Sequence, residues 1–158
     1  MGTIDEDMRR VVEEQRLGYA ATVCPDATPN LSPKGTTAVW DDDLVFADIR
    51  SPRTVENLRH NPAIEINVVD PISRKGYRFK GTGTVLTEGT QFDEALAFYR
   101  RRGVASVLRA VVLVEVGRVE PLTSPAYDLG ATEQEVRERW ERHHEALRWD
   151  ESGAPTGK

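Results

Sequence analysis

The valine- and leucine-rich run inside SVLRAVVLVEVGRVEPL, residues 106–122, most constrains how this chain can fold. Its middle carries apolar residues at consecutive positions, which is typical of a strand buried on both faces. The run therefore predicts a central strand. It is too apolar for an edge open to solvent, and this favours burial at an interface between two copies of the chain.

The other strand-like segments follow one another mostly as hairpins, with helical patterns inserted between them. Strands are expected at YAATVC (19–24), LSPKGTTAVW (31–40), LVFADI (44–49), AIEINVVD (63–70) and YRFKGTGTVLTEG (77–89). Pro33 and Gly35 interrupt the second of these, as at a sheet edge, a bulge or a close approach to a ligand. This order is not the regular alternation of a parallel sheet. It predicts a mainly β fold, an antiparallel split barrel with peripheral helices.

Helix-start signals occur at four places in the chain. Thr3, Thr90 and Thr132 are expected as N-caps of three helices, and a further helix begins near Pro52 and ends before Pro62. We expect one domain over residues 1–150, which includes the last helix, and a flexible tail at 151–158.

Composition limits the classes of function. The formal net charge is −5, from 26 acidic and 21 basic residues, which argues against a nucleic-acid-binding protein. Cys24 is the only cysteine, so an internal disulfide is impossible. No apolar run approaches the roughly 20 residues that cross a bilayer. The polar start MGTIDEDMRR is unlike a signal peptide, so a cytoplasmic location is expected.

No residue pattern in the chain supports chemistry by the protein alone. His143 and His144 are adjacent on a helix and cannot form an i, i+4 metal pair, so no metal site is expected. Neither a nucleophile–base arrangement nor a phosphate-binding glycine loop is present, and no catalytic residue can be named. If the protein is an enzyme, a cofactor supplies the reactivity.

The stretch RSPRT, residues 50–54, places positive side chains at a helix start. Ser51 is expected to cap this helix and Pro52 to take its first position, leaving the amides of Arg53 and Thr54 exposed. Because a helix N-terminus is already positive, Arg50 and Arg53 there cost stability unless an anion is present. A phosphate group would remove the conflict. The alternative is a capped surface helix with two solvated arginines, and this spacing alone favours it.

The stretch SPKGTT, residues 32–37, repeats the same kinds of residue one hairpin earlier. Antiparallel pairing of this segment with residues 44–49 would bring Lys34 toward the end of the barrel that holds Arg53. Gly35 would let a flat ring system lie against the backbone. The alternative is a bulged edge strand with an exposed lysine.

From about Met8 to Leu122, the chain resembles flavin-binding split-barrel proteins related to pyridoxamine 5'-phosphate oxidase. The resemblance rests on the series strand, SPRT, NLRHNP, strand and YRFKGTG. It implies FMN bound at a homodimer interface. The strand expected along the flavin carries Ser32, Pro33, Lys34, Gly35, Thr36 and Thr37, and the next strand carries Phe46, Ala47 and Asp48 near the ribityl chain and ring.

The same resemblance implies roles for residues outside these two strands. Arg53 and Thr54 fall where the family binds the FMN phosphate, with Ser51 and Asn57 as further cofactor-binding candidates. Three residues are expected to reach the flavin of a partner subunit, namely Arg78, Lys80 and Trp149.

The resemblance thus implies an FMN-dependent oxidoreductase that transfers hydride between the flavin and a small substrate. Two departures argue against pyridoxamine 5'-phosphate oxidase activity itself. Lys75–Arg78 replaces a glutamine-containing stretch of the oxidase, and a helix replaces its final arginine- and histidine-bearing strand. The alternatives are a flavin-binding protein without a substrate, for storage, electron transfer or sensing, and an F420-dependent reductase. Other relatives bind haem.

Overall fold

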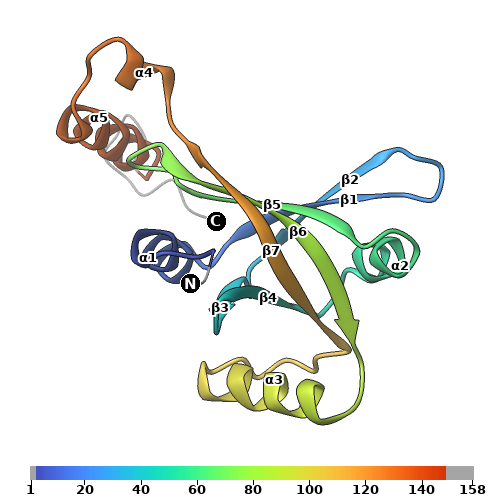
Figure 1. The fold of residues 1–158 in the computed structure, drawn as a ribbon. Coiled ribbons are helices and arrows are strands. Elements are labelled where there is room, and N and C mark those ends of the chain that lie inside the picture. Colours follow the sequence, from blue (N-terminus) through green and yellow to red (C-terminus); the bar gives the residue numbers. More distant parts are fainter. Residues whose placement is uncertain (1–2, 149–158) are drawn as a thin grey trace.

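Residues 3–148, which the computed structural model describes, form a seven-stranded antiparallel sheet with helices on its outside (Figure 1). The strands are β1 (Gly18–Val23), β2 (Pro29–Lys34), β3 (Ala38–Trp40), β4 (Asp43–Asp48), β5 (Ala63–Asp70), β6 (Lys75–Leu86) and β7 (Ala110–Leu122). The helices are α1 (Glu6–Gln15), α2 (Pro52–His60), α3 (Thr90–Arg101), α4 (Pro125–Asp128) and α5 (Glu133–Ala146). The predicted fold class, mainly β with peripheral helices, is confirmed.

The sheet closes on itself because its two outermost strands are neighbours in the chain. The strand order is β2-β1-β5-β6-β7-β4-β3, yet only residues 35–37 separate β2 from β3. So short a link spans at most about 14 Å when fully extended. The sheet must therefore curl until its two edges lie close together.

The segment LSPKGTTAVW, expected as one strand, is two strands joined by a turn. β2 pairs with β1, whereas β3 pairs with β4, so the two halves lie at opposite edges of the sheet. In the turn, the amide and the hydroxyl of Thr37 both donate to the carbonyl of Lys34, at 3.3 and 2.8 Å. Gly18 opposite Lys34 leaves room for Thr37, because a Cβ there would lie 2.6 Å from the Thr37 hydroxyl.

The strand β7 is central and buried on both faces over its first half, as predicted. Val112 and Val114 face the barrel interior, where they pack with Phe46, Ile66 and Phe79. Val111 belongs to a second apolar cluster beneath α3, formed with Val45, Ala95, Tyr99 and Leu108. The chain thus covers both faces of β7 by itself, so this strand no longer argues for a partner subunit.

Two helix caps differ from the sequence prediction. The N-cap of α1 is Asp5 rather than Thr3, because the Asp5 carboxylate accepts the Met8 amide at 2.8 Å. The N-cap of α3 is Gly89, and Thr90 is the first helical residue. Thr132 caps α5 as predicted, and its hydroxyl accepts the Glu135 amide at 3.2 Å.

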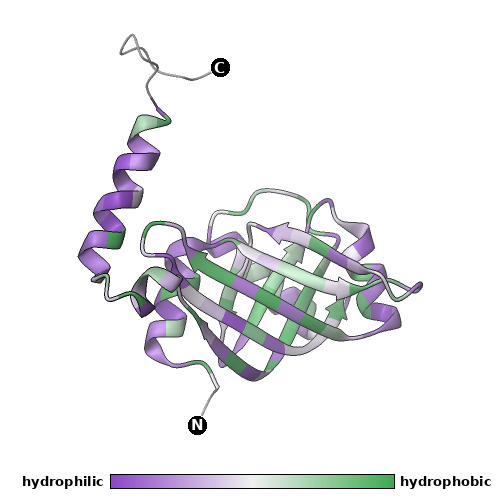
Figure 2. Ribbon diagram, turned by 90° about the horizontal axis from the view of Figure 1, so that it is seen from above, coloured by the Kyte–Doolittle hydropathy of each residue, from purple (hydrophilic) through white to green (hydrophobic). Residues whose placement is uncertain are grey.

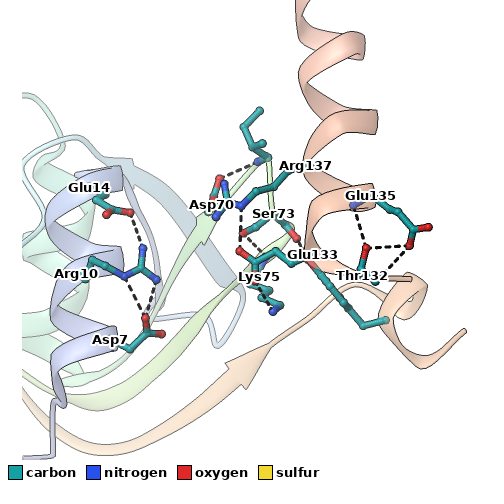
Figure 3. A network of polar contacts seen from close by, with 12 residues as sticks. Asp7, Arg10, Glu14, Asp70, Ser73, Lys75, Thr132, Glu133, Glu135 and Arg137 are labelled. Atoms are coloured by element: carbon teal, nitrogen blue, oxygen red, sulfur yellow. Dashed lines mark hydrogen bonds and ion pairs between the residues drawn. The ribbon is translucent and has the colours of Figure 1, made fainter. Parts of the chain in front are cut away.

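The helix α5 is predominantly polar and docks against the β5–β6 turn, beyond the barrel (Figures 1 and 2). Lys75 pairs with Glu133 at 2.7 Å, and Arg137 pairs with Asp70 at 3.1 Å (Figure 3). The Arg74 guanidinium also stacks 3.4 Å from the centre of the Trp140 ring. This end of the molecule is held mainly by charged and aromatic contacts.

Candidate functional site

The helix α2 begins at Pro52 as predicted, but its cap is built differently. The Ser51 side chain makes no capping bond, and the Ser51 amide instead donates to the Asp48 carboxylate at 2.7 Å. The Thr54 amide donates back to the Ser51 carbonyl at 3.2 Å. The prediction that this amide is free was therefore wrong. Asp48 therefore ties the end of β4 to the first turn of α2.

The first turn of α2 leaves one polar atom without a partner. Thr54 is 1% exposed, and its hydroxyl oxygen is buried with no hydrogen bond. Unsatisfied buried hydroxyls are uncommon, since each costs free energy. Arg50 and Arg53 are exposed beside this turn, and within residues 3–148 neither forms an ion pair. A donor group and two unpaired cations thus gather at a helix start that is itself positive.

Lys34 is linked to this helix start through Asp48, and not by the strand pairing that the sequence suggested. Residues 35–37 fold back onto β4, so that the Lys34 ammonium nitrogen lies 5.6 Å from the centre of the Phe46 ring. Lys34 is only 4% exposed, which excludes the alternative of a solvated edge lysine. Burial lowers the pKa of Lys34, and the nearby Asp48 carboxylate opposes that shift. Lys34, Asp48, Ser51, Arg53 and Thr54 together are called the α2 site below.

The turn beside Lys34 is fixed by contacts from distant parts of the chain. The Thr36 hydroxyl accepts the Ala47 amide at 2.8 Å and lies 3.3 Å from the Ala47 carbonyl. The hydroxyl of Tyr99, on α3, donates to the Thr36 carbonyl at 2.9 Å. Sequence reasoning missed Tyr99, because nothing local connects a helix residue with a turn 63 positions earlier. Gly35 is exposed in this fixed turn.

Of the other residues predicted to bind the cofactor, some expose a group near the α2 site and others are buried in the barrel. Ser32 accepts a hydrogen bond from Lys34 at 2.9 Å, while Pro33 is exposed on the edge strand β2. The Phe46 side chain packs in the barrel core and Ala47 packs under α3, so only their backbone groups are available to a ligand. Asn57 points inward and donates to the Thr22 hydroxyl at 3.0 Å.

Arg78 and Lys80 lie away from the α2 site, on the outer face of β6. Lys80 pairs with Glu65 at 3.0 Å, and Arg78 lies 3.9 Å from Glu65 and 3.7 Å from Glu120. Both cations are already balanced within the chain. Trp149 lies outside the described residues, as does the tail at 151–158.

Two surface hollows are relevant to ligand binding. A hollow of about 420 Å³ lies beside α2 and is lined by Asp48, Pro52, Val55, Glu56, Arg59, Thr87, Arg109 and Ala110. A hollow of about 290 Å³ lies between α1 and α5. Its charged side chains pair with one another, as Asp7 does with Arg10 and Lys75 with Glu133 (Figure 3). Among the described residues, the second hollow therefore offers no unpaired charged side chain to a ligand.

Within residues 3–148, no cluster of histidine, cysteine and carboxylate side chains could hold a metal ion. Of the helices in the same range, none is long and apolar enough to span a membrane.

Sequence comparison identifies a matching family. The profile of the pyridoxamine 5'-phosphate oxidase family matches residues 4–123. Among curated proteins, none matches the chain.

Solved structures of the same fold carry several different names. HupZ from Group A Streptococcus is 33% identical, with a TM-score of 0.70 over 77% of this chain and 95% of HupZ. An FMN-binding protein from Syntrophomonas wolfei is 16% identical, with a TM-score of 0.64 over 75% of this chain and 86% of its own. A protein named F420 reductase is 19% identical, with a TM-score of 0.58 over 74% of this chain and 98% of its own.

Proposed function

Because the chain belongs to the pyridoxamine 5'-phosphate oxidase family, we propose that it is an FMN-binding oxidoreductase acting on a small organic substrate. The flavin, when bound, supplies hydride transfer to or from that substrate. The protein's part is to bind the phosphate, hold the ring and exclude water. The α2 site and the turn at residues 35–37 are the parts of the chain that we assign to these tasks.

The observation that carries the proposal is the unsatisfied hydroxyl of Thr54 beside two unpaired arginines. A phosphate oxygen accepts hydrogen bonds from a hydroxyl, from amides and from guanidinium groups, and it favours the positive end of a helix. The residues present therefore fit a phosphate. Arg53 and Thr54 are the proposed phosphate ligands, and Ser32–Thr37 the segment that lies along the flavin.

Two alternative functions would use the same phosphate contacts. F420 also carries a phosphate, and one protein of the same fold is named F420 reductase. A flavin-binding protein that turns over no substrate, for storage, electron transfer or sensing, would need the same site as well. Pyridoxamine 5'-phosphate oxidase activity is not proposed, because α5 follows the barrel where the oxidase has its substrate-binding strand.

Two measurements on the purified protein test the proposal. The absorption spectrum distinguishes bound FMN from F420 and from haem, and an FMN spectrum is expected. Oxidation of NAD(P)H by the FMN-loaded protein with an electron acceptor then separates an oxidoreductase from a flavin carrier. A protein that acquires no flavin spectrum after incubation with FMN would contradict the proposal.

We further propose that the working unit is a homodimer with a flavin shared at each end of the interface. Support comes from the outer face of β1 and β2, where Tyr19 is 45% and Leu31 is 67% exposed. An apolar hollow of about 240 Å³ lies on the same face, lined in part by Ala21, Val23 and Pro29. In such a dimer, Arg78, Lys80 and Trp149 stay candidates for contact with the partner's flavin.

A further inference from the structure

Lys34 is a buried cation with no direct ion pair, although the buried Asp48 carboxylate lies near enough to favour its charge. Its ammonium group can donate three hydrogen bonds, yet it makes one, to the Ser32 hydroxyl at 2.9 Å. Within the described part of the chain, no carboxylate oxygen lies within 4.0 Å of it. The face of the Phe46 ring, 5.6 Å away, offers only a weak attraction.

Several cations of this protein that are more exposed than Lys34 are nevertheless paired. Lys75 contacts Glu133, Lys80 contacts Glu65, and Arg102 contacts Glu13 at 2.5 Å. Removing a cation from water without a directly paired counter-charge is unfavourable, so a buried lysine of this kind destabilises the fold. A methionine of similar length would pack there without that cost. The arrangement is explained if a ligand brings a negative charge into direct contact with the ammonium group.

We propose that Lys34 stabilises the negative charge that the flavin ring gains on reduction, and that it thereby raises the reduction potential of the bound flavin. This inference rests on the proposed function. A hydride from a reductant such as NAD(P)H carries two electrons and one proton. It therefore converts the neutral oxidised ring into a reduced ring with one negative charge, and the reductant leaves as NAD(P)⁺.

The place of Lys34 in the fold suits the ring rather than the phosphate. The phosphate is assigned to the first turn of α2, where Arg53 and Thr54 already provide a cation and a donor. Lys34 immediately precedes Gly35, the exposed residue against which we place the ring. A cation within about 4–6 Å of an anion shifts a charge-linked equilibrium by roughly one to three powers of ten. The oxidised flavin has a neutral ring, so the positive charge of Lys34 stabilises it much less.

The test compares Lys34→Met and Lys34→Gln, which remove the charge, with Lys34→Arg, which keeps it. The control is Lys75→Met, which removes an equally charged side chain at the other end of the barrel. For each variant, the FMN affinity is measured by fluorescence titration and the midpoint potential by equilibration with a reference dye. The stability of each flavin-free variant is measured by urea unfolding.

The two neutral variants should bind oxidised FMN nearly as the parent does and bind reduced FMN at least about tenfold more weakly. Each tenfold difference lowers a two-electron potential by about 30 mV. Lys34→Arg should recover most of the potential, and Lys75→Met should keep the parent value. Without flavin, Lys34→Met should be at least as stable as the parent.

Three outcomes would overturn the assignment while leaving flavin binding intact. The first is a potential in both neutral variants equal to that of the parent. The second is a loss of affinity for oxidised FMN but not for riboflavin, which would assign the ammonium to the phosphate. The third is a destabilised flavin-free Lys34→Met, which would show that the protein alone holds the charge. A parent protein that binds no flavin would instead overturn the proposed function and this inference together.

Discussion

The hydroxyl of Tyr99 donates a hydrogen bond of 2.9 Å to the main-chain carbonyl of Thr36, joining α3 to the turn between β2 and β3. Tyr99 is buried, and burial raises its pKa, so the phenol keeps its proton throughout the physiological range. The turn next to Lys34 thus depends on a helix that follows it by more than 50 residues.

Replacing Tyr99 with Phe should destabilise the fold by about 1–3 kcal/mol, because the Thr36 carbonyl loses its partner in a partly buried place. Urea unfolding monitored by circular dichroism measures the loss. Tyr77→Phe is the matched control, since its hydroxyl contacts the exposed carboxylate of Asp7, where water can substitute. Equal stability of Tyr99→Phe and the parent would contradict the role of Tyr99 in fixing this turn.

Gly35→Ala should leave stability unchanged and weaken FMN binding. A Cβ at Gly35 meets no atom within 4 Å, and its backbone is not left-handed, so the flavin-free protein has room for a methyl group. If a ring packs against this residue, the methyl causes overpacking of about 1–3 kcal/mol, or roughly a 5- to 150-fold loss of affinity. Fluorescence titration checks the affinity.

Gly18→Ala provides the contrast to this variant. Its Cβ would lie 2.6 Å from the Thr37 hydroxyl oxygen and 2.8 Å from a methyl carbon of Ile66, so it should lower stability. Unchanged FMN affinity in Gly35→Ala would show that no ring lies against Gly35.

The docking of α5 should weaken in acid. Hydrogen bonds from Lys75 and Arg137 lower the pKa of Glu133 below its ordinary value of 4.5. A lowered folded-state pKa means that the stabilisation is complete above that ordinary value and is lost as pH falls through the lowered one. Because Lys75 and Glu133 are both more than 40% exposed, each pair contributes only about 0.2–1 kcal/mol.

Thermal unfolding between pH 7 and pH 3 tests this pH dependence. Glu133→Gln should lower the melting temperature at pH 7 and flatten its fall below about pH 4.5, whereas Glu141→Gln on the same helix should follow the parent. Parallel curves for Glu133→Gln and the parent would show that the pair with Lys75 contributes nothing.

The parent protein should sediment at about twice the 17.7 kDa chain mass and remain so at micromolar concentration. Obligate homodimers of this kind bury more than about 2,000 Å² in total. Leu31→Glu should dissociate the dimer by placing a charge on the exposed face of β2. Val107→Glu, at a still more exposed site before β7, should not. A flavin-loaded parent that sediments as a monomer would contradict both the dimer and the shared site.

Much of the fold follows from local patterns in the sequence. The start of α2 follows from Pro52, the cap of α5 from Thr132, and the central place of β7 from its run of valines. These signals act within a few residues, so they can be recognised without knowledge of the whole chain. The alternation of hairpins then leaves an antiparallel barrel as the simplest arrangement.

Two of the missed features depend on contacts between distant residues. The break in the strand at residues 31–40 depends on Thr36 bonding to Ala47 and on Tyr99 bonding to Thr36. The burial of Lys34 has the same origin, since a lysine next to a glycine on an edge strand is ordinarily solvated. The third feature is local: the Asp48 carboxylate, three residues earlier, accepts a hydrogen bond from the Ser51 amide, and the general preference for serine as a capping residue does not reveal this bond.

The most direct test of the central claim is the preference of the protein for FMN over riboflavin, measured in the parent and in Arg53→Ala. Removing a charge-assisted hydrogen bond to the phosphate costs about 1.5–3 kcal/mol, so FMN should bind Arg53→Ala roughly 10- to 100-fold more weakly. Riboflavin, which lacks the phosphate, should bind both proteins almost equally, and Arg142→Ala on α5 should behave as the parent. Equal FMN affinity in the parent and in Arg53→Ala would contradict the assignment of the phosphate to the start of α2.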